Sequence, residues 1–378
     1  MIAGADPNLR NQLGRSPLHL AAEAGHHRVI GSLLLNKADV DAKTSWQLLT
    51  PLHLAASEGQ VLCVSELLLG GADKDVVDSY GETALYMASE NNHLEVVEEL
   101  LAAGANHGIR NNNDFSPFTV AASTGHADVV EALLDKDSSQ VDATDGDGWT
   151  ALHFAANVDG PVRDNGEVVR VLLGAGAGVN VKATTASSST PLHVAVDRRI
   201  ASDGTIHALL EGGANVHART RRDNTPLHVA CKRSSVTSVE LLLRWGADEN
   251  LTNDVRQTAT DVIGALRQND LHDEELEADN QRVRQMLARA PADRSWRRRG
   301  WLVLSRACPT RVQIANGNSS SSNSNVSSAK VARVGGEVSS RDDEETEEDQ
   351  MMVDLRGLVG RLVGLEADGL FRLVVGFL

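Results

Sequence analysis

The chain has 378 residues and an acidic balance, with 52 acidic against 36 basic side chains and a formal net charge of −16. This balance argues against broad nucleic-acid binding, which needs clustered Lys and Arg side chains. No run of 18 or more apolar residues occurs, so the sequence predicts no membrane-spanning helix. Aromatic residues make up only 3% of the chain, and we therefore expect a core of Leu, Val and Ala.

A four-residue phrase, Ser/Thr-Pro/Ala-Leu-His in its full form, recurs along the chain at steps of 33 to 40 residues. Its copies begin at Ser16, Thr50, Thr83, Ser116, Thr150, Thr190, Thr225 and, in a degenerate form, Thr258. The Ser or Thr hydroxyl accepts hydrogen bonds from the first free N–H groups of a helix, and Pro fits the first helical position. The phrase therefore predicts recurring helix starts, and its period is typical of a stack of helix pairs.

The residues after each phrase predict the rest of a unit. A glycine suited to the left-handed end of a helix follows in three units, at Gly25, Gly59 and Gly125. Apolar pairs three to four residues apart, such as Val96-Val97 and Leu100-Leu101, predict a second helix. A Gly-Ala-Asp or Gly-Ala-Asn segment then closes several units, at Gly71, Gly104, Gly213 and Gly246.

Because phrase, glycine, apolar pairs and closing segment recur in order, the chain resembles the ankyrin-repeat family. The resemblance covers seven units over residues 11–256. It implies an all-α solenoid in which each unit has two antiparallel helices and a projecting, hairpin-like finger. It also implies that binding uses the fingers and the inner helix face.

Two units carry extra residues between their helices, around 159–164 and 199–203. We interpret these as tolerated growth of surface loops, with a contact role as the alternative. Residues 1–10 are predicted to be the remnant of a preceding finger, so we expect the chain to begin inside a longer gene product, with pairing of this end with another molecule as the alternative. Residues 257–308 are predicted to form a degenerate repeat and cap, with a weakened helix over Thr258–Leu266 and a second over Glu277–Arg289.

The remaining chain differs in composition. Residues 309–350 are rich in Ser and Asn and then acidic, which predicts a disordered linker. Residues 351–378 are predicted to form an amphipathic helical segment, for which docking on the repeats is favoured over binding a partner or lying on a membrane. The tail also resembles those of expanded algal ankyrin-repeat proteins.

Histidine is abundant, but its spacing does not indicate a metal site. Five histidines fill the fourth position of the phrase: His19, His53, His153, His193 and His228. The family resemblance implies that these rings bond the backbone and the Thr hydroxyl and tie units together. Rings one repeat apart cannot share one metal ion. No phosphate loop, nucleophile elbow or paired-carboxylate motif occurs, so we predict no catalytic, cofactor-binding or metal-ligating residue.

The three cysteines lie far apart in the sequence. Cys63 and Cys231 occupy helix positions where other units have Val or Ala, and Cys308 lies beyond the repeats. We predict small buried thiols rather than a disulfide or a metal site. A reducing compartment follows, so we expect the protein in the cytoplasm, with the nucleus as an alternative.

Side chains in the fingers are the candidates for partner contact. Four aromatic residues lie on consecutive fingers: Trp46, Tyr80, Phe115 and Trp149. Exposed aromatic side chains are common interface anchors, and the alternative is that each ring folds back on its own finger. Arg221 and Arg222, beside Arg219, form a basic finger that would meet an acidic partner or else be a solvated tip.

The sequence as a whole favours a monomeric, non-enzymatic scaffold that binds a protein partner of unknown identity. The alternative is an adaptor that recruits a ubiquitin-ligase complex through the C-terminal helices, although the expected Leu-Pro-x-Pro element is missing. An enzyme would need its chemistry after about residue 290, where no histidine occurs.

Overall fold

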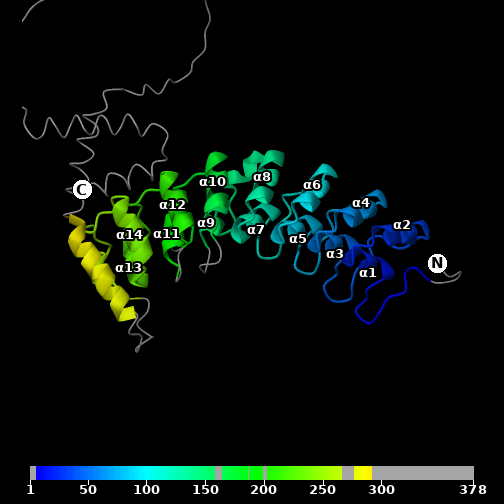
Figure 1. Cartoon of the computed structure of the whole chain (residues 1–378), viewed down its shortest axis with the longest axis horizontal. Helices are drawn as coiled ribbons and strands as arrows, with labels where there is room; N and C mark the ends of the chain where they lie inside the picture. Colours follow the sequence, from blue (N-terminus) through cyan, green and yellow to red (C-terminus); the bar gives the residue numbers. More distant parts are fainter. Residues whose placement is uncertain (1–5, 158–163, 186, 199–201, 266–275, 292–378) are drawn as a thin grey trace, which may run out of the picture. The chain divides into compact units, whose positions relative to one another are not determined.

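The computed structural model describes residues 6–157, 164–185, 187–198, 202–265 and 276–291. The predictions for the linker at 309–350, for the segment at 351–378 and for Cys308 lie outside these residues. Most of the two inserted loops also lies outside them. Within the described residues, the helices form two rows with loops projecting from one of them (Figure 1).

The first row contains the helices that start at the phrase. These are α1 (Pro17–Glu23), α3 (Pro51–Ser57), α5 (Ala84–Glu90), α7 (Pro117–Thr124), α9 (Ala151–Ala156), α11 (Pro191–Val196) and α13 (Pro226–Arg233). Thr50 shows why they start there: its backbone is extended, with φ −92° and ψ 166°, and its hydroxyl accepts a hydrogen bond from the N–H of His53. The predicted helix starts are confirmed for seven units.

The eighth start is an exception, and the helix expected over Thr258–Leu266 is wrong. Over residues 258–265, which the structure describes, only a single turn of 3-10 helix forms, η2 (Thr260–Val262). Gly264 adopts a left-handed φ of 74°, and its N–H donates a hydrogen bond to the carbonyl of Cys231 in the preceding unit. The backbone therefore turns back onto the last full repeat instead of continuing as a helix.

The second row contains the partner helices. These are α2 (His27–Leu35), α4 (Val61–Leu69), α6 (Leu94–Ala102), α8 (Ala127–Lys136), α10 (Gly166–Gly174), α12 (Asp203–Glu211) and α14 (Val236–Arg244). The turn between the rows needs a left-handed residue, and Gly59 supplies it with a φ of 70°. A Cβ atom at Gly59 would lie 2.6 Å from the His93 ring, so this position also requires close approach. Asn92 and Ser234 adopt the same conformation in units that lack this glycine.

One continuous apolar core runs through the units, built mainly from Leu, Val and Ala. The Leu of the phrase is at most 1% exposed in six units, at Leu18, Leu52, Leu85, Leu152, Leu192 and Leu227. Burying one such side chain is worth about 1.5–3 kcal/mol, so each unit is held mainly by its neighbours. Cys63 and Cys231 lie in this core, as predicted, and burial raises the pKa of the Cys231 thiol to about 12.

The fingers are closed turns, and no strand occurs among the described residues. A backbone hydrogen bond closes each of them, such as Asn111 N–H to Phe115 O at 2.8 Å. Neighbouring tips are also joined, such as Asn112 N–H to Tyr80 O at 2.8 Å. Between the fourth and fifth fingers the Asp114 carboxylate accepts from Gly146 N–H instead. Hydrogen bonds therefore connect neighbouring fingers along the array.

Both ends of the array are built on the repeat pattern. Asn8 accepts a hydrogen bond from Asp39 N–H at 2.7 Å, as Asp41 does from Asp73 N–H at 3.1 Å in the next unit. At the other end, a helix over residues 276–291 follows the eighth finger, close to the predicted second helix. Its Val283 and Leu287 side chains are 0% and 3% exposed within the core.

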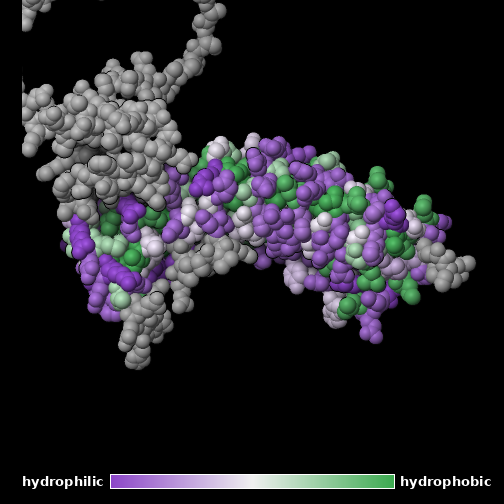
Figure 2. Space-filling model, viewed as in Figure 1, coloured by the Kyte–Doolittle hydropathy of each residue, from purple (hydrophilic) through white to green (hydrophobic). Residues whose placement is uncertain are grey.

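The surface is least polar at the first units. Most exposed large hydrophobic side chains lie between Leu9 and Tyr80, and green patches mark this end in Figure 2. Val29 is 47% exposed, whereas its equivalents Cys63, Val96 and Val129 are almost fully buried by a preceding unit. Hydrophobic exposure therefore changes along the array although the backbone repeats.

Candidate functional site

The five phrase histidines form a row at the base of the fingers. Each Nε2 atom lies 3.0–3.1 Å from a backbone carbonyl oxygen of the next unit. The ring–carbonyl pairs are His19–Leu49, His53–Glu82, His153–Ser189, His193–Asn224 and His228–Gln257. The acceptor is always the residue just before the next phrase, so each ring links one helix to the following finger.

The partners of the other ring nitrogen identify the tautomer. In each case Nδ1 accepts a hydrogen bond from the N–H of the Ser or Thr that starts the helix, as at His53, where the distance is 3.1 Å. Nδ1 therefore carries no proton, and Nε2 donates to the carbonyl. Burial lowers the pKa of all five rings, and that of His193 falls to about 4. These neutral, fully bonded rings hold repeats together and are not poised for acid–base chemistry.

The histidine row has two gaps. The third and fourth units carry Tyr86 and Thr119 at this position. Their counterparts in the next fingers are Phe115 and Trp149, whose carbonyls receive no side-chain hydrogen bond within the described part of the chain. These two residues are also the aromatic pair that the sequence placed just before the phrase. The fingers with the strongest candidate anchors are thus the two that lack the histidine link.

Two positions per unit meet where the finger joins its inner helix, and we call them the corner pair. One is the residue just before the phrase, and the other lies seven residues after the Ser or Thr. Arg15 and Glu23 form an ion pair there at 2.7 Å, and Lys232 donates to Asn224 at 3.3 Å. From the first to the seventh unit the pairs are Arg15/Glu23, Leu49/Ser57, Glu82/Glu90, Phe115/Ser123, Trp149/Asn157, Ser189/Asp197 and Asn224/Lys232.

The corner pairs in the middle of the array contain aromatic residues. Phe115 and Trp149 are half-buried, and both pack on Phe154 of α9, with ring centres 4.7 and 5.3 Å from its own. Phe154 was not singled out in the sequence, although it directly follows a phrase histidine, where other units have Leu, Val or Met. The three rings join two fingers and one inner helix into a single apolar surface, so neither ring folds back on its own finger alone.

The other predicted contact residues stand apart from this cluster. Trp46 is 81% exposed and Tyr80 is 57% exposed, both on finger tips, and neither makes a ring contact with another described residue. Arg221 and Arg222 are exposed on the tip of the seventh finger. The structure therefore brings Phe115 and Trp149 together but leaves Trp46, Tyr80 and the two arginines as separate exposed points.

Charge changes sign along the corner pairs. In the third unit Glu82 faces Glu90, and burial followed by the nearby carboxylates raises the pKa of Glu82. In the seventh unit Lys232 lies near Arg222, and burial followed by the Arg222 charge lowers the pKa of Lys232. The aromatic cluster lies between an acidic and a basic corner.

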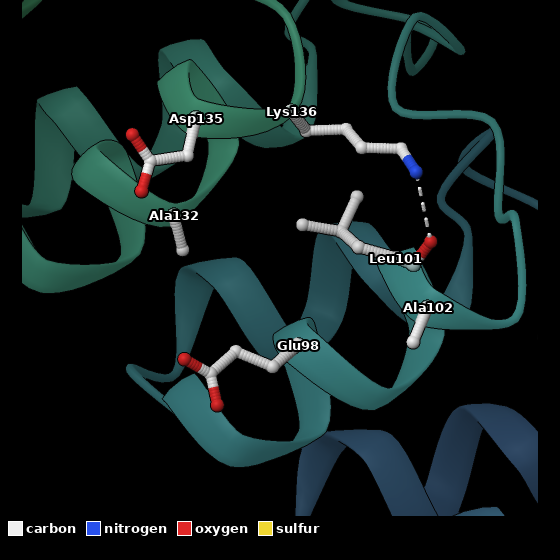
Figure 3. Close-up of a pocket in the computed structure, with 6 residues that line it drawn as sticks. All are labelled: Glu98, Leu101, Ala102, Ala132, Asp135 and Lys136. Carbon is white, nitrogen blue, oxygen red and sulfur yellow. Dashed lines mark hydrogen bonds between the residues drawn. The ribbon is translucent and has the colours of Figure 1, made fainter.

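A hollow of about 310 Å³ lies on the second helix row, between the ends of α6 and α8. Glu98 and Asp135 project from the two helices, and the Lys136 ammonium donates to the carbonyl of Leu101 at 3.3 Å (Figure 3). That bond places a cation at the C-terminal end of α6, where the helix dipole favours one. The lysine is thus engaged in holding two repeats together.

Among the described residues, no group of three or more His, Cys, Asp or Glu side chains has a metal-binding arrangement. In the same part of the chain, no helix combines the length and hydrophobicity needed to cross a membrane.

No curated protein matches the chain. Among solved structures, the human ASB11 ankyrin repeat domain aligns with a TM-score of 0.53 and 28% sequence identity, covering 62% of this chain and 99% of that one. The family model for ankyrin repeats (3 copies) matches residues 1–78, 33–111, 52–145, 85–183 and 162–253. Ankyrin repeats generally mediate protein–protein interaction and are typically non-enzymatic. The matches to the family model together span most of the repeat array and two thirds of the chain, which therefore belongs to the ankyrin-repeat family.

Proposed function

We propose that this protein is a non-enzymatic scaffold that binds a protein partner along its corner pairs, anchored on the Phe115–Phe154–Trp149 cluster. The observation that carries the proposal is the position of this cluster. Apart from Leu49/Ser57, the corners of the other units are charged or polar, whereas Phe115 and Trp149 place half-buried rings here that pack on Phe154. Half-buried aromatic side chains on a rigid support are typical anchors of protein interfaces.

The support for these rings is ordered before a partner arrives. Phe115 and Trp149 each end a finger turn that a backbone hydrogen bond closes, at 2.8 and 3.0 Å. Their rings pack on Phe154, which is 5% exposed on an inner helix. Since few rotatable groups must be fixed on binding, the entropic cost of association is small. Trp46 and Tyr80 would add peripheral contacts from the tips of earlier fingers.

The test is quantitative co-purification from cells with a matched aromatic control. The test variant combines Phe115→Ala with Trp149→Ala. The control is Trp245→Ala, which removes a ring that is 42% exposed at the end of α14 in the second helix row. We expect proteins retained by the wild-type chain and by the control to be lost at least about tenfold from the double variant.

Folding must be measured beside binding, because both rings touch Phe154. We expect the double variant to lose about 1–3 kcal/mol of unfolding free energy while remaining folded. If the variant stays folded and retains the same proteins, the cluster is not the anchor. The adaptor alternative depends on residues 351–378, which lie outside the described residues, and it stays a prediction.

A further inference from the structure

The seventh unit concentrates positive charge in an otherwise acidic chain. Residues 219–233 contain five cations and one carboxylate, whereas the whole chain carries a net charge of −16. The cations are Arg219, Arg221, Arg222, Lys232 and Arg233. Three lie in the finger and two at the end of α13, so the finger and the inner helix both contribute to this basic corner.

Two of these cations are already occupied. Arg219 donates to the carbonyls of Asp223 and Thr252, at 3.2 and 2.9 Å, and thereby links two fingers. Arg233 forms an ion pair with Asp197 of the preceding unit at 2.8 Å. These two side chains therefore stabilise contacts within the array.

The other three cations have donors to spare. Within the described residues, the guanidinium groups of Arg221 and Arg222 make no hydrogen bond or ion pair. In the same part of the chain, Lys232 donates only to the neutral amide of Asn224, at 3.3 Å. A guanidinium can donate two parallel hydrogen bonds to one carboxylate, so this corner has unused capacity for anions.

Like charges are held close together at this corner. Burial and the charge of Arg222 both lower the pKa of Lys232, while the carboxylates of Asp197 and Asp254 act in the opposite direction. Asp197 is engaged by Arg233. A further anion beside Lys232 and Arg222 would relieve their repulsion, because an opposite charge stabilises the ionised form of each.

We infer that this basic corner binds an acidic peptide segment of the partner whose apolar residue sits on the Phe115–Phe154–Trp149 cluster. The inference rests on the proposed function and specifies the chemistry of the partner. The cluster and the corner lie two units apart, and the intervening inner helices α9, α11 and α13 pack in sequence. Packed helices are about 8–10 Å apart, so the distance is about 16–20 Å.

That distance sets a spacing in the partner. An extended chain advances about 3.3 Å per residue, so the acidic residues should lie about six positions from the apolar anchor. A peptide fits better than a nucleic acid, because the basic patch is confined to one unit and the neighbouring units carry acidic groups that repel a long polyanion.

The experiment selects from a display library of random 16-residue peptides on the full chain. We expect enriched peptides to carry a hydrophobic residue with Asp or Glu about six positions away. The test variant combines Arg221→Glu with Arg222→Glu. The control, Arg28→Glu with Lys37→Glu, changes the net charge equally at two exposed cations of the first unit.

Synthetic copies of the selected peptides are then titrated by fluorescence anisotropy, beside a single-stranded oligonucleotide. We expect the test variant to bind the peptides at least about tenfold more weakly and the control to bind them normally. Peptides with no acidic bias that bind both variants equally but lose affinity for Trp149→Ala would overturn the acidic segment and leave the proposed function standing. Peptides that ignore Trp149→Ala as well would overturn both. Oligonucleotide binding that depends on Arg221 and Arg222, without peptide binding, would also refute the inference.

Discussion

Of the seven described fingers that follow another unit, five are held by a histidine of the preceding unit, and two are not. The held fingers present Leu49, Glu82, Ser189, Asn224 and Gln257 just before the phrase, and each gives its carbonyl to a buried ring. The two others present Phe115 and Trp149, with Tyr86 and Thr119 in place of the ring. The fingers that carry the aromatic anchors therefore lack one of the hydrogen bonds that stabilise the others.

The largest expected effect is acid destabilisation of the held fingers. Each ring has a folded-state pKa below the unfolded value of about 6.5, because burial disfavours the charged imidazolium. Stability is therefore complete above about pH 6.5 and falls as the pH drops toward the folded pKa. For His193, with a folded pKa of about 4, the loss between pH 7 and pH 5 is about 2 kcal/mol, and the other four rings add to it.

The measurement is the urea midpoint of the full chain at pH 7 and pH 5. Glu82 and Asp41 oppose the trend, because their pKa values are raised and their protonation favours the folded state. The comparison that isolates a ring is therefore between the wild-type chain and His193→Gln. A loss of stability between pH 7 and pH 5 that is the same in both chains would show that this histidine does not titrate as described.

The next effect distinguishes the two kinds of finger by substitution. His153→Ala removes a ring that is 0% exposed, leaving a cavity and depriving the N–H of Thr150 of its acceptor. We expect it to lower the free energy of unfolding by about 2–4 kcal/mol. Thr119→Ala is the matched change in a unit without the link and should cost only about 1 kcal/mol. Equal losses at the two positions would mean that the bond to Ser189 contributes little.

Much of this arrangement follows from the sequence alone. Seven of the helix starts and the left-handed turns are local properties that repeat with the phrase, and the structure confirms them. The end of the array was harder, since the turn at Gly264 depends on a hydrogen bond to Cys231 in another unit. The sequence indicated two members of the aromatic cluster, Phe115 and Trp149, but not Phe154, because Phe154 joins them through packing between units.

The gaps in the histidine row were readable in the sequence, but their consequence was not. Tyr86 and Thr119 stand where other units have His, yet only the structure shows that the ring would meet the carbonyl of the next finger. That geometry connects each gap with the aromatic residue about 30 positions later in the chain. Pairings of this range need the register of neighbouring repeats, which a single repeat does not contain.

The smallest expected effect would close one gap. Tyr86→His introduces an imidazole between Thr83 and the carbonyl of Phe115, the arrangement seen at His53 between Thr50 and Glu82. We expect it to raise the free energy of unfolding by about 0.5–1.5 kcal/mol relative to Tyr86→Asn, which is also polar but too short to reach the next finger. The reference to Asn is needed because removing the buried tyrosine ring has its own cost. Hydrogen exchange at Asn111 N–H, which bonds the same Phe115 carbonyl, should slow in Tyr86→His alone. If the two variants unfold alike and exchange alike, the missing histidine is not what distinguishes the Phe115 finger, and packing on Phe154 accounts for its position.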